Sequence, residues 1–198
     1  MITPIKSARE LPTAHLLGTG TSMCAGCGGL QALHEIYDLL GTKTVFVNAA
    51  GCMTLLATYP FTPFRGSWLY TAMASASAGA QGVRDALDVL LAKGRIAAAE
   101  DMTTVVLAGD GSSYGMGLSA TSAAIERGLD FIYLCYDNEG YGNTGQQHSA
   151  ATPHGARTAT TGAGACRTEL LDVDEGRDSS DRDLQRGRCL TPPVHHSP

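Results

Sequence analysis

GDGSSYGMGLSATSAAIERGLDFIYLCYDNEGYGNTGQQHS, residues 109–149, is the stretch that decides the fold of this chain. It opens with an aspartate between two glycines at the end of an apolar run. One helical segment (115–128) and a second apolar run (131–137) follow, and then a second polar, glycine-rich turn. A parallel crossover brings two such turns to the same edge of a sheet. The stretch therefore predicts a strand–helix–strand unit whose two loops form a site.

The amino-terminal half continues this pattern. Apolar residues at helical spacing predict a helix over 28–41, with a glycine at its end, and TKTVFVNAA predicts a buried strand over 44–47. A loop rich in proline and aromatic residues is expected over 59–68, followed by a small-residue helix over 71–94. Helices alternating with buried strands indicate an α/β protein with a doubly wound, mostly parallel sheet.

Composition limits the class of protein. The 198 residues are 43% hydrophobic, which suffices for one compact domain. The formal net charge of −5 without a basic run predicts no nucleic-acid partner. The absence of a signal peptide or a long apolar run predicts a cytoplasmic protein without a membrane segment. In that compartment the six cysteines are expected to remain thiols.

Three regions are expected along the chain: an arm over 1–14, the folded domain over 15–164, and a tail over 165–198. The tail is rich in arginine and contains no lysine, no aromatic residue and no helical or strand period. A polar segment of this kind cannot bury enough apolar surface to fold alone, so it is predicted to be disordered.

Two loop residues of the opening stretch indicate a cation site. Asp110 ends one predicted strand, and Asn138 follows the next strand after a helix, so the amide oxygen should arrive beside the carboxylate. Mg²⁺ prefers such oxygen ligands and keeps positions free for phosphate oxygens or water. A GDG triplet alone is a common turn, but the pair predicts a site for a cation and a diphosphate.

Cysteine spacing indicates a second site. Cys24 and Cys27 form a CxxC pair, and Cys52 lies beyond a predicted helix and strand. Zinc, with His34 as a further ligand, a redox dithiol and an iron–sulfur cluster all remain open from spacing alone. Cys135 lies within a predicted strand and is expected to be a core residue. His148, after the NTG turn, is the one histidine expected near the site.

Together, MCAGCGG, the later Gly-Cys, GDG and CYDNEGYGNTGQQHS resemble the thiamine diphosphate-binding (beta) subunit of the 2-oxoacid:ferredoxin oxidoreductases. The similarity runs from about residue 16 to residue 161. The resemblance implies the thiamine diphosphate-binding fold, with Mg²⁺ held by Asp110, Asn138 and the Gly140 carbonyl. It also implies a [4Fe–4S] cluster on the three cysteines. The residues expected to line the cofactor are Gly51, Cys52, Gly109, Asp110, Gly111, Ser112, Asn138, Gly140, Tyr141, Asn143, Thr144 and Gly145.

The same resemblance implies oxidative decarboxylation of a 2-oxoacid to acyl-CoA and CO₂, with electrons passed through the cluster to ferredoxin. Expected partners are a larger (alpha) subunit, a ferredoxin-like subunit, ferredoxin, the 2-oxoacid and coenzyme A. The activating glutamate of the family sits on the partner subunit, so no catalytic acid–base residue is assigned here. The lone chain is expected to be inactive.

Two alternatives remain: an iron-free thiamine diphosphate-dependent decarboxylase or synthase, and a truncated, non-catalytic fragment of the oxidoreductase subunit. The family takes its fourth cluster ligand from a carboxyl-terminal cysteine. This chain has only Cys166 and Cys189 in its unlike tail, and neither can be matched to that ligand. One hypothesis for the tail is a frameshift in a GC-rich gene, which a single inserted or deleted base would explain.

Overall fold

The computed structural model describes residues 7, 10, 15–58 and 60–165 of the chain. The expectations for the arm over 1–14 and for the tail over 165–198 fall almost wholly outside these residues. Cys166 and Cys189 lie outside them as well.

Four parallel strands form the centre of the molecule. In chain order the sheet strands and longer helices are α1 (Gly28–Leu40), β1 (Thr44–Ala49), β2 (Ser67–Thr71), α2 (Ala76–Ala92), β3 (Thr103–Gly109), α3 (Leu118–Glu126) and β4 (Ile132–Tyr136). Short helical turns also occur at η2 (Cys52–Leu56), η3 (Ala98–Glu100) and η4 (Gly111–Met116). The strand order is β2-β1-β3-β4, and every neighbouring pair is parallel.

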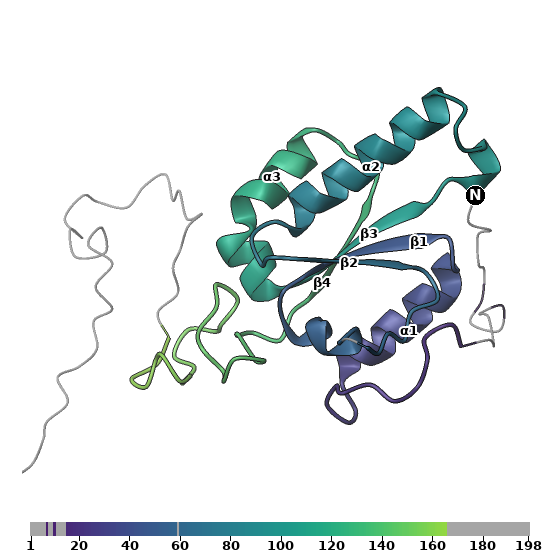
Figure 1. Cartoon of the computed structure of the whole chain (residues 1–198). Coiled ribbons are helices and arrows are strands. Elements are labelled where there is room, and N and C mark those ends of the chain that lie inside the picture. Colours follow the sequence, from purple (N-terminus) through teal and green to yellow (C-terminus); the bar gives the residue numbers. More distant parts are fainter. Residues whose placement is uncertain (1–6, 8–9, 11–14, 59, 166–198) are drawn as a thin grey trace, which may run out of the picture.

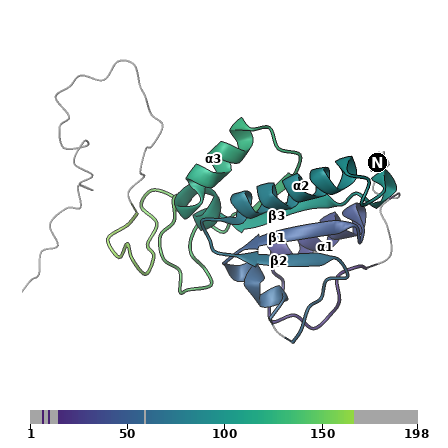
Figure 2. The ribbon, with the colours of Figure 1, turned by 45° about the horizontal axis from the view of Figure 1, so that its top comes forward.

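Helices cover both faces of the sheet, as Figure 1 shows: α1 lies on one side, and α2 and α3 lie on the other. The view in Figure 2 shows the same three layers. Each face has its own apolar cluster. Leu33 and Tyr37 of α1 pack with Phe46 and Leu107 on one face, whereas Ala76 and Ala80 of α2 belong to the cluster on the other. The predicted doubly wound α/β fold is confirmed.

The central strands are apolar throughout because both of their faces are covered. All six residues of β1 are buried, as are the middle five of β3. Small residues on α2 allow its backbone to approach the sheet. A Cβ at Gly79 would already lie 3.2 Å from Val47 Cγ1, so the small-residue content of this helix reflects close helix–sheet packing.

Strand β2 corrects the sequence-based prediction, which placed a loop over 59–68 and began a helix at residue 71. Ser67–Thr71 is an edge strand with mostly exposed side chains, and α2 begins only at Ala76. An edge strand pairs on one side through its backbone, so it does not need the apolar run by which buried strands are recognised. Trp68 is its anchor, stacked on Phe64 with ring centroids 4.4 Å apart.

The topology places a crevice at the carboxyl ends of β1 and β3. After β1 the chain moves outward to β2, and after β3 it moves outward in the opposite direction, to β4. Adjacent strands whose connections diverge leave a gap between their loops, which is where ligands bind in open α/β sheets. Among the residues that the structure describes, no helix is both long and apolar enough to cross a membrane.

Candidate functional site

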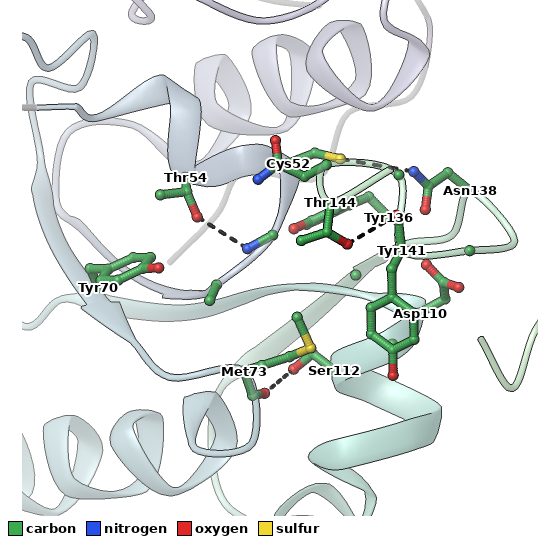
Figure 3. Close-up of a pocket in the computed structure, with 17 residues that line it drawn as sticks. Cys52, Thr54, Tyr70, Met73, Asp110, Ser112, Tyr136, Asn138, Tyr141 and Thr144 are labelled. Carbon is green, nitrogen blue, oxygen red and sulfur yellow. Dashed lines mark hydrogen bonds between the residues drawn. The ribbon is translucent and has the colours of Figure 1, made fainter. Parts of the chain in front are cut away.

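A cavity of about 270 Å³, here called the cofactor cavity, lies at this crevice. The chain segments that follow all four strands contribute to its wall, as the close-up in Figure 3 shows. The lining residues are Ala50, Gly51, Cys52, Thr54, Tyr70, Met73, Gly109, Asp110, Gly111, Ser112, Tyr136, Asn138, Gly140, Tyr141, Gly142, Asn143 and Thr144.

Asp110 is the carboxylate of the cofactor cavity, and hydrogen bonds hold it in place. Its side chain follows the end of β3 and is 1% exposed. One carboxylate oxygen, Oδ2, accepts a hydrogen bond from the Ser149 hydroxyl. Ser149 is held in turn, because its backbone N–H donates to Thr152 Oγ1 at 2.9 Å and the Thr152 hydroxyl donates to the Glu139 carbonyl at 2.6 Å. The second carboxylate oxygen, Oδ1, is left to face Asn138.

Three oxygens gather beside Asp110. With the amide oxygen of Asn138 turned toward the carboxylate, Asn138 Oδ1 lies 2.9 Å from Asp110 Oδ1 and 2.9 Å from the Gly140 carbonyl. We call these three atoms the oxygen triad. In octahedral coordination with metal–oxygen distances of about 2.0–2.1 Å, neighbouring ligand oxygens lie about 2.9 Å apart. In this orientation of the amide, the two distances from Asn138 Oδ1 therefore suit a hard divalent cation such as Mg²⁺.

The loop over 137–149 holds this geometry through strained backbone. Glu139 and Gln146 have φ values of 60° and 62°, and they are the non-glycine residues with positive φ in the described part of the chain. The Asp137 carboxylate accepts the Glu139 N–H at 2.9 Å, which closes the first turn. Such backbone costs of the order of 1–3 kcal/mol per residue and concentrates at ligand sites.

Two glycines of the cofactor cavity, Gly109 and Gly111, lie against tyrosine rings. A Cβ at Gly111 would run into the Tyr141 ring, and a Cβ at Gly109 would lie 3.2 Å from Tyr136 Cε2. The two rings therefore lie against the GDG turn: this packing requires glycine at position 111 and leaves little room for a side chain at position 109.

A second cavity, of about 590 Å³, lies against α1 and contains Cys24, Cys27 and Cys52 in its wall. We call it the cysteine cavity. The CxxC pair forms a turn just before α1, in which the Cys27 N–H donates to the Cys24 carbonyl at 3.2 Å. Gly26, with φ +73°, permits that turn. Cys24 is exposed, whereas Cys27 and Cys52 are half-buried.

No three His, Cys, Asp or Glu side chains between residues 15 and 165, leaving aside residue 59, stand close enough to bind one common metal ion. His34, which a zinc site was expected to use, does not line the cysteine cavity. An iron–sulfur cluster makes a different demand, because each thiolate binds its own iron and the sulfurs surround a group larger than one ion. Three cysteines around a cavity of this size fit the cluster better than they fit zinc.

Cys52 belongs to both cavities. It begins η2, just after the end of β1, and its Sγ lies 3.9 Å from Asn138 Nδ2, a contact drawn in Figure 3. Burial raises the pKa of the Cys52 thiol above its ordinary value, and the neighbouring Cys24 and Cys27 raise it further. Hydrogen bonds from the Asn143 backbone and the Asn138 side chain act in the opposite direction.

Residues 49–174 match the model of the thiamine pyrophosphate enzyme C-terminal TPP-binding domain. The chain belongs to this family. As its name says, this is a domain family that binds thiamine pyrophosphate, the cofactor also called thiamine diphosphate.

The curated relatives indicate a more specific relationship than the domain family does. The chain is 44% identical over 153 residues to pyruvate synthase subunit PorB of Methanothermobacter thermautotrophicus, which covers 77% of this chain and 51% of PorB. It is 35% identical over 161 residues to ketoisovalerate oxidoreductase subunit VorB of Pyrococcus horikoshii, covering 81% of the chain and 51% of VorB. The predicted resemblance is confirmed, and the chain spans about half the length of these relatives.

Among solved structures, the 2-oxoglutarate:ferredoxin oxidoreductase of Magnetococcus marinus has the same fold, with a TM-score of 0.57 at 20% identity. The match covers 82% of this chain and 54% of that one.

Of the residues predicted to line the cofactor, all but Gly145 line the cofactor cavity of this TPP-binding domain. Gly145, with φ +114°, instead lets the loop turn. Cys135 is not a core residue as expected: it is half-buried on the edge strand β4, where it raises the pKa of Tyr114 to about 12. His148 does not line the cavity, and its backbone N–H donates to Thr160 Oγ1.

The sequence-based reasoning missed Ser149, Tyr136 and Tyr70. A serine eleven residues after Asn138 has no spacing rule that ties it to Asp110, and only the return of the loop brings the two together. Tyr70 was missed because it belongs to β2, the strand that was not predicted. Tyr136 was read as part of an apolar run, and its ring position follows from the glycines opposite it.

Proposed function

We propose that this chain is the thiamine diphosphate-binding part of a 2-oxoacid:ferredoxin oxidoreductase. One observation carries the proposal: the cofactor cavity and the cysteine cavity share a wall, formed by Cys52, Tyr136 and Asn138. An iron-free thiamine enzyme does not require three thiols next to its cofactor. In an oxidoreductase, the same arrangement puts an electron acceptor directly next to the place where electrons are released.

In this proposal the oxygen triad of Asp110, Asn138 and Gly140 holds Mg²⁺. A cation held there would supply coordination positions for the diphosphate of the cofactor, because a protein ligand set of three leaves positions free. The Ser149 hydroxyl occupies the other oxygen of the Asp110 carboxylate, which keeps Oδ1 directed at the cation. When bound, thiamine diphosphate supplies the electron sink that decarboxylation of a 2-oxoacid requires.

Cys24, Cys27 and Cys52 would hold the [4Fe–4S] cluster. Conversion of one 2-oxoacid and one coenzyme A to acyl-CoA and CO₂ releases two electrons and a proton. A cluster held by these cysteines would supply one-electron transfer, so that the two electrons could leave to two ferredoxins. Thiolates are suitable ligands because soft sulfur favours iron–sulfur clusters over hard cations. A [4Fe–4S] cluster takes four protein ligands, and this chain has three matched cysteines. The fourth ligand must therefore be another residue.

The relatives extend to about twice the matched length, and PorB and VorB are subunits by name. We therefore propose that a larger subunit, a ferredoxin-like subunit and ferredoxin are the partners, in the cytoplasm. The described lining of the cofactor cavity contains no glutamate, histidine or lysine. A partner subunit would supply the proton-transferring group, and the lone chain would be inactive.

The test begins with the anaerobically purified chain. Calorimetry measures Mg²⁺-dependent binding of thiamine diphosphate, and iron and sulfide analysis with electron paramagnetic resonance measures the cluster. Reconstitution with the partner subunits and a panel of 2-oxoacids, followed with a viologen dye, then measures the reaction. Cofactor binding without iron after reconstitution would leave the iron-free enzyme as the function. Binding of neither cofactor nor cluster would leave the non-catalytic fragment.

A further inference from the structure

One side chain, Asn138, stands between the two proposed sites. Its amide oxygen belongs to the oxygen triad, and its amide nitrogen is 3.9 Å from Cys52 Sγ. We propose that Asn138 is a positioning residue that couples the two sites: a cation on the triad fixes the amide so that its N–H₂ group donates to the Cys52 sulfur. This inference rests on the proposed function, because it requires that the triad binds Mg²⁺.

Two orientations of the amide are possible, and they differ in hydrogen bonding. With nitrogen toward the triad, the amide donates to Asp110 Oδ1 and to the Gly140 carbonyl, both at 2.9 Å. With oxygen toward the triad, three oxygens face one another without a hydrogen between them, and only a cation relieves their repulsion. Without the cation the first orientation is therefore favoured, and with the cation the second is favoured.

The Asn138 side chain is exposed, and Gly142 and Cys52 lie beside its amide nitrogen. A Cβ at Gly142 would lie 2.7 Å from Asn138 Nδ2 and 3.7 Å from Cys52 Sγ, so a larger residue there would displace the amide. The second donor to Cys52 is a backbone group, the Asn143 N–H, which has no side-chain amide that can turn. The Asn138 amide is thus the donor to this sulfur that depends on the state of the cofactor site.

The coupling has an electronic consequence. Hydrogen bonds to cluster thiolates raise the reduction potential of an iron–sulfur cluster, because they stabilise the additional negative charge of the reduced state. A cation on the triad would therefore make the cluster a better electron acceptor when the cofactor is in place. The cluster would be a weaker acceptor when the cofactor site is empty.

The chain has three asparagines, at positions 48, 138 and 143, which allows a direct test. Selective ¹⁵N labelling of asparagine in the 198-residue chain gives three side-chain amide signals, and Asn138→Asp identifies one of them by its loss. Spectra are recorded with and without Mg²⁺ and thiamine diphosphate. The cluster-free chain is used for these spectra.

Cys52→Ala is the decisive variant and Cys24→Ala is its matched control. Cys24 lines the same cavity but has no hydrogen bond to Asn138. We expect Cys52→Ala to shift the Asn138 amide signal strongly when Mg²⁺ and thiamine diphosphate are present and little when they are absent. Cys24→Ala should leave the signal in place under both conditions.

The outcomes separate the two proposals. Calorimetry that detects no Mg²⁺-dependent cofactor binding overturns the proposed function, and this inference with it. Cofactor binding together with a Cys52→Ala shift that is equal with and without Mg²⁺ overturns the coupling alone. In the iron-loaded chain, potentiometric titration should show a higher cluster potential with Mg²⁺ and thiamine diphosphate than without, and an unchanged potential contradicts the electronic role of Asn138.

Discussion

The oxygen triad and the three cysteines lie on either side of Asn138, yet they are built differently. Asp110 is buried and hydrogen-bonded to Ser149, in a loop attached to the ends of two buried or half-buried strands. Cys24 is exposed on a turn before α1, and only Cys52 follows a central strand. The fold itself thus fixes the proposed cation site in advance, whereas the final geometry of the cysteine site would depend on the cluster that we propose for it.

This difference has an electrostatic reason. A buried carboxylate is costly unless hydrogen bonds or a cation compensate it, so the fold that buries Asp110 must also supply its partners. A thiol at the surface carries no such cost. It can remain unpaired in the protein, and its position is correspondingly less constrained.

The largest effect is expected from Asp110→Ala. The variant removes the charged ligand of the triad, and losing a buried, paired charge costs about 3 kcal/mol, so Mg²⁺-dependent affinity for thiamine diphosphate should fall by about 100-fold or more. Calorimetry measures this, with the exposed Asp130→Ala as control. Iron content should remain that of the unmodified chain. An Asp110→Ala chain that loses its iron would show that the two sites do not form independently.

Cys52→Ala tests the opposite case, in which a thiol of the cysteine site is removed and the oxygen triad is left intact. One of three matched thiolates is lost, so bound iron and sulfide should fall to less than half of the unmodified value, with loss of the visible cluster absorbance. Cofactor affinity should change by no more than about threefold, because the contact of Asn138 with sulfur is weak next to a bound cation. A large loss of cofactor affinity would contradict the view that the fold shapes the cation site without the cluster.

Ser149→Ala is expected to have an intermediate effect. It tests directly whether the fold positions the Asp110 carboxylate before a cation binds. Removing the hydroxyl leaves Asp110 Oδ2 without its donor. Hydrogen bonds to charged groups contribute about 1.5 kcal/mol or more, so the Mg²⁺-dependent cofactor affinity should fall about tenfold. Ser122→Ala, at an exposed position on α3, serves as the matched control in the same calorimetric titration. Equal affinities for the two variants would mean that Asp110 needs no second partner.

Tyr136→Phe is expected to have the smallest effect, on stability. The Tyr136 hydroxyl is buried between the two cavities and has no hydrogen-bond partner in the described part of the chain; the Met53 backbone N–H nearby lies outside bonding geometry. Removing an unpaired hydroxyl should be neutral at pH 7 or raise the free energy of unfolding by up to about 1 kcal/mol. Urea denaturation measures this, with the exposed Tyr70→Phe as control.

The same variant makes a prediction about pH. Burial raises the pKa of Tyr136 above the ordinary value of about 10, so the unfolded chain loses this proton first. The stability that the protonated phenol provides is fully present below that ordinary pKa and is lost as the pH rises above it. The unmodified chain should therefore lose more stability than Tyr136→Phe between neutral pH and about pH 10.5. A greater alkaline loss in Tyr136→Phe would contradict this sign.

Much of the fold followed from the sequence, because buried strands and their covering helices leave strong periodic signals. The runs that became β1, β3 and β4 were recognised, and so were α1 and α3 within a few residues. Strand β2 was not, since an edge strand is held by backbone pairing and only Trp68 buries its side chain against the core. The close approach of Asp110 and Asn138 was predicted from their positions after successive strands, because parallel topology brings the ends of such strands together.

The sequence by itself determined which residue types are available to the proposed sites: carboxylate, amide and carbonyl oxygens after β3 and β4, and thiols before α1 and after β1. Only the tertiary structure decided which of these groups share a wall. Ser149 reaches Asp110, and Asn138 reaches Cys52, across 39 and 86 residues of sequence. Such contacts depend on loop conformation and on the close approach that glycines permit at positions 109, 111 and 142, and neither leaves a period in the sequence.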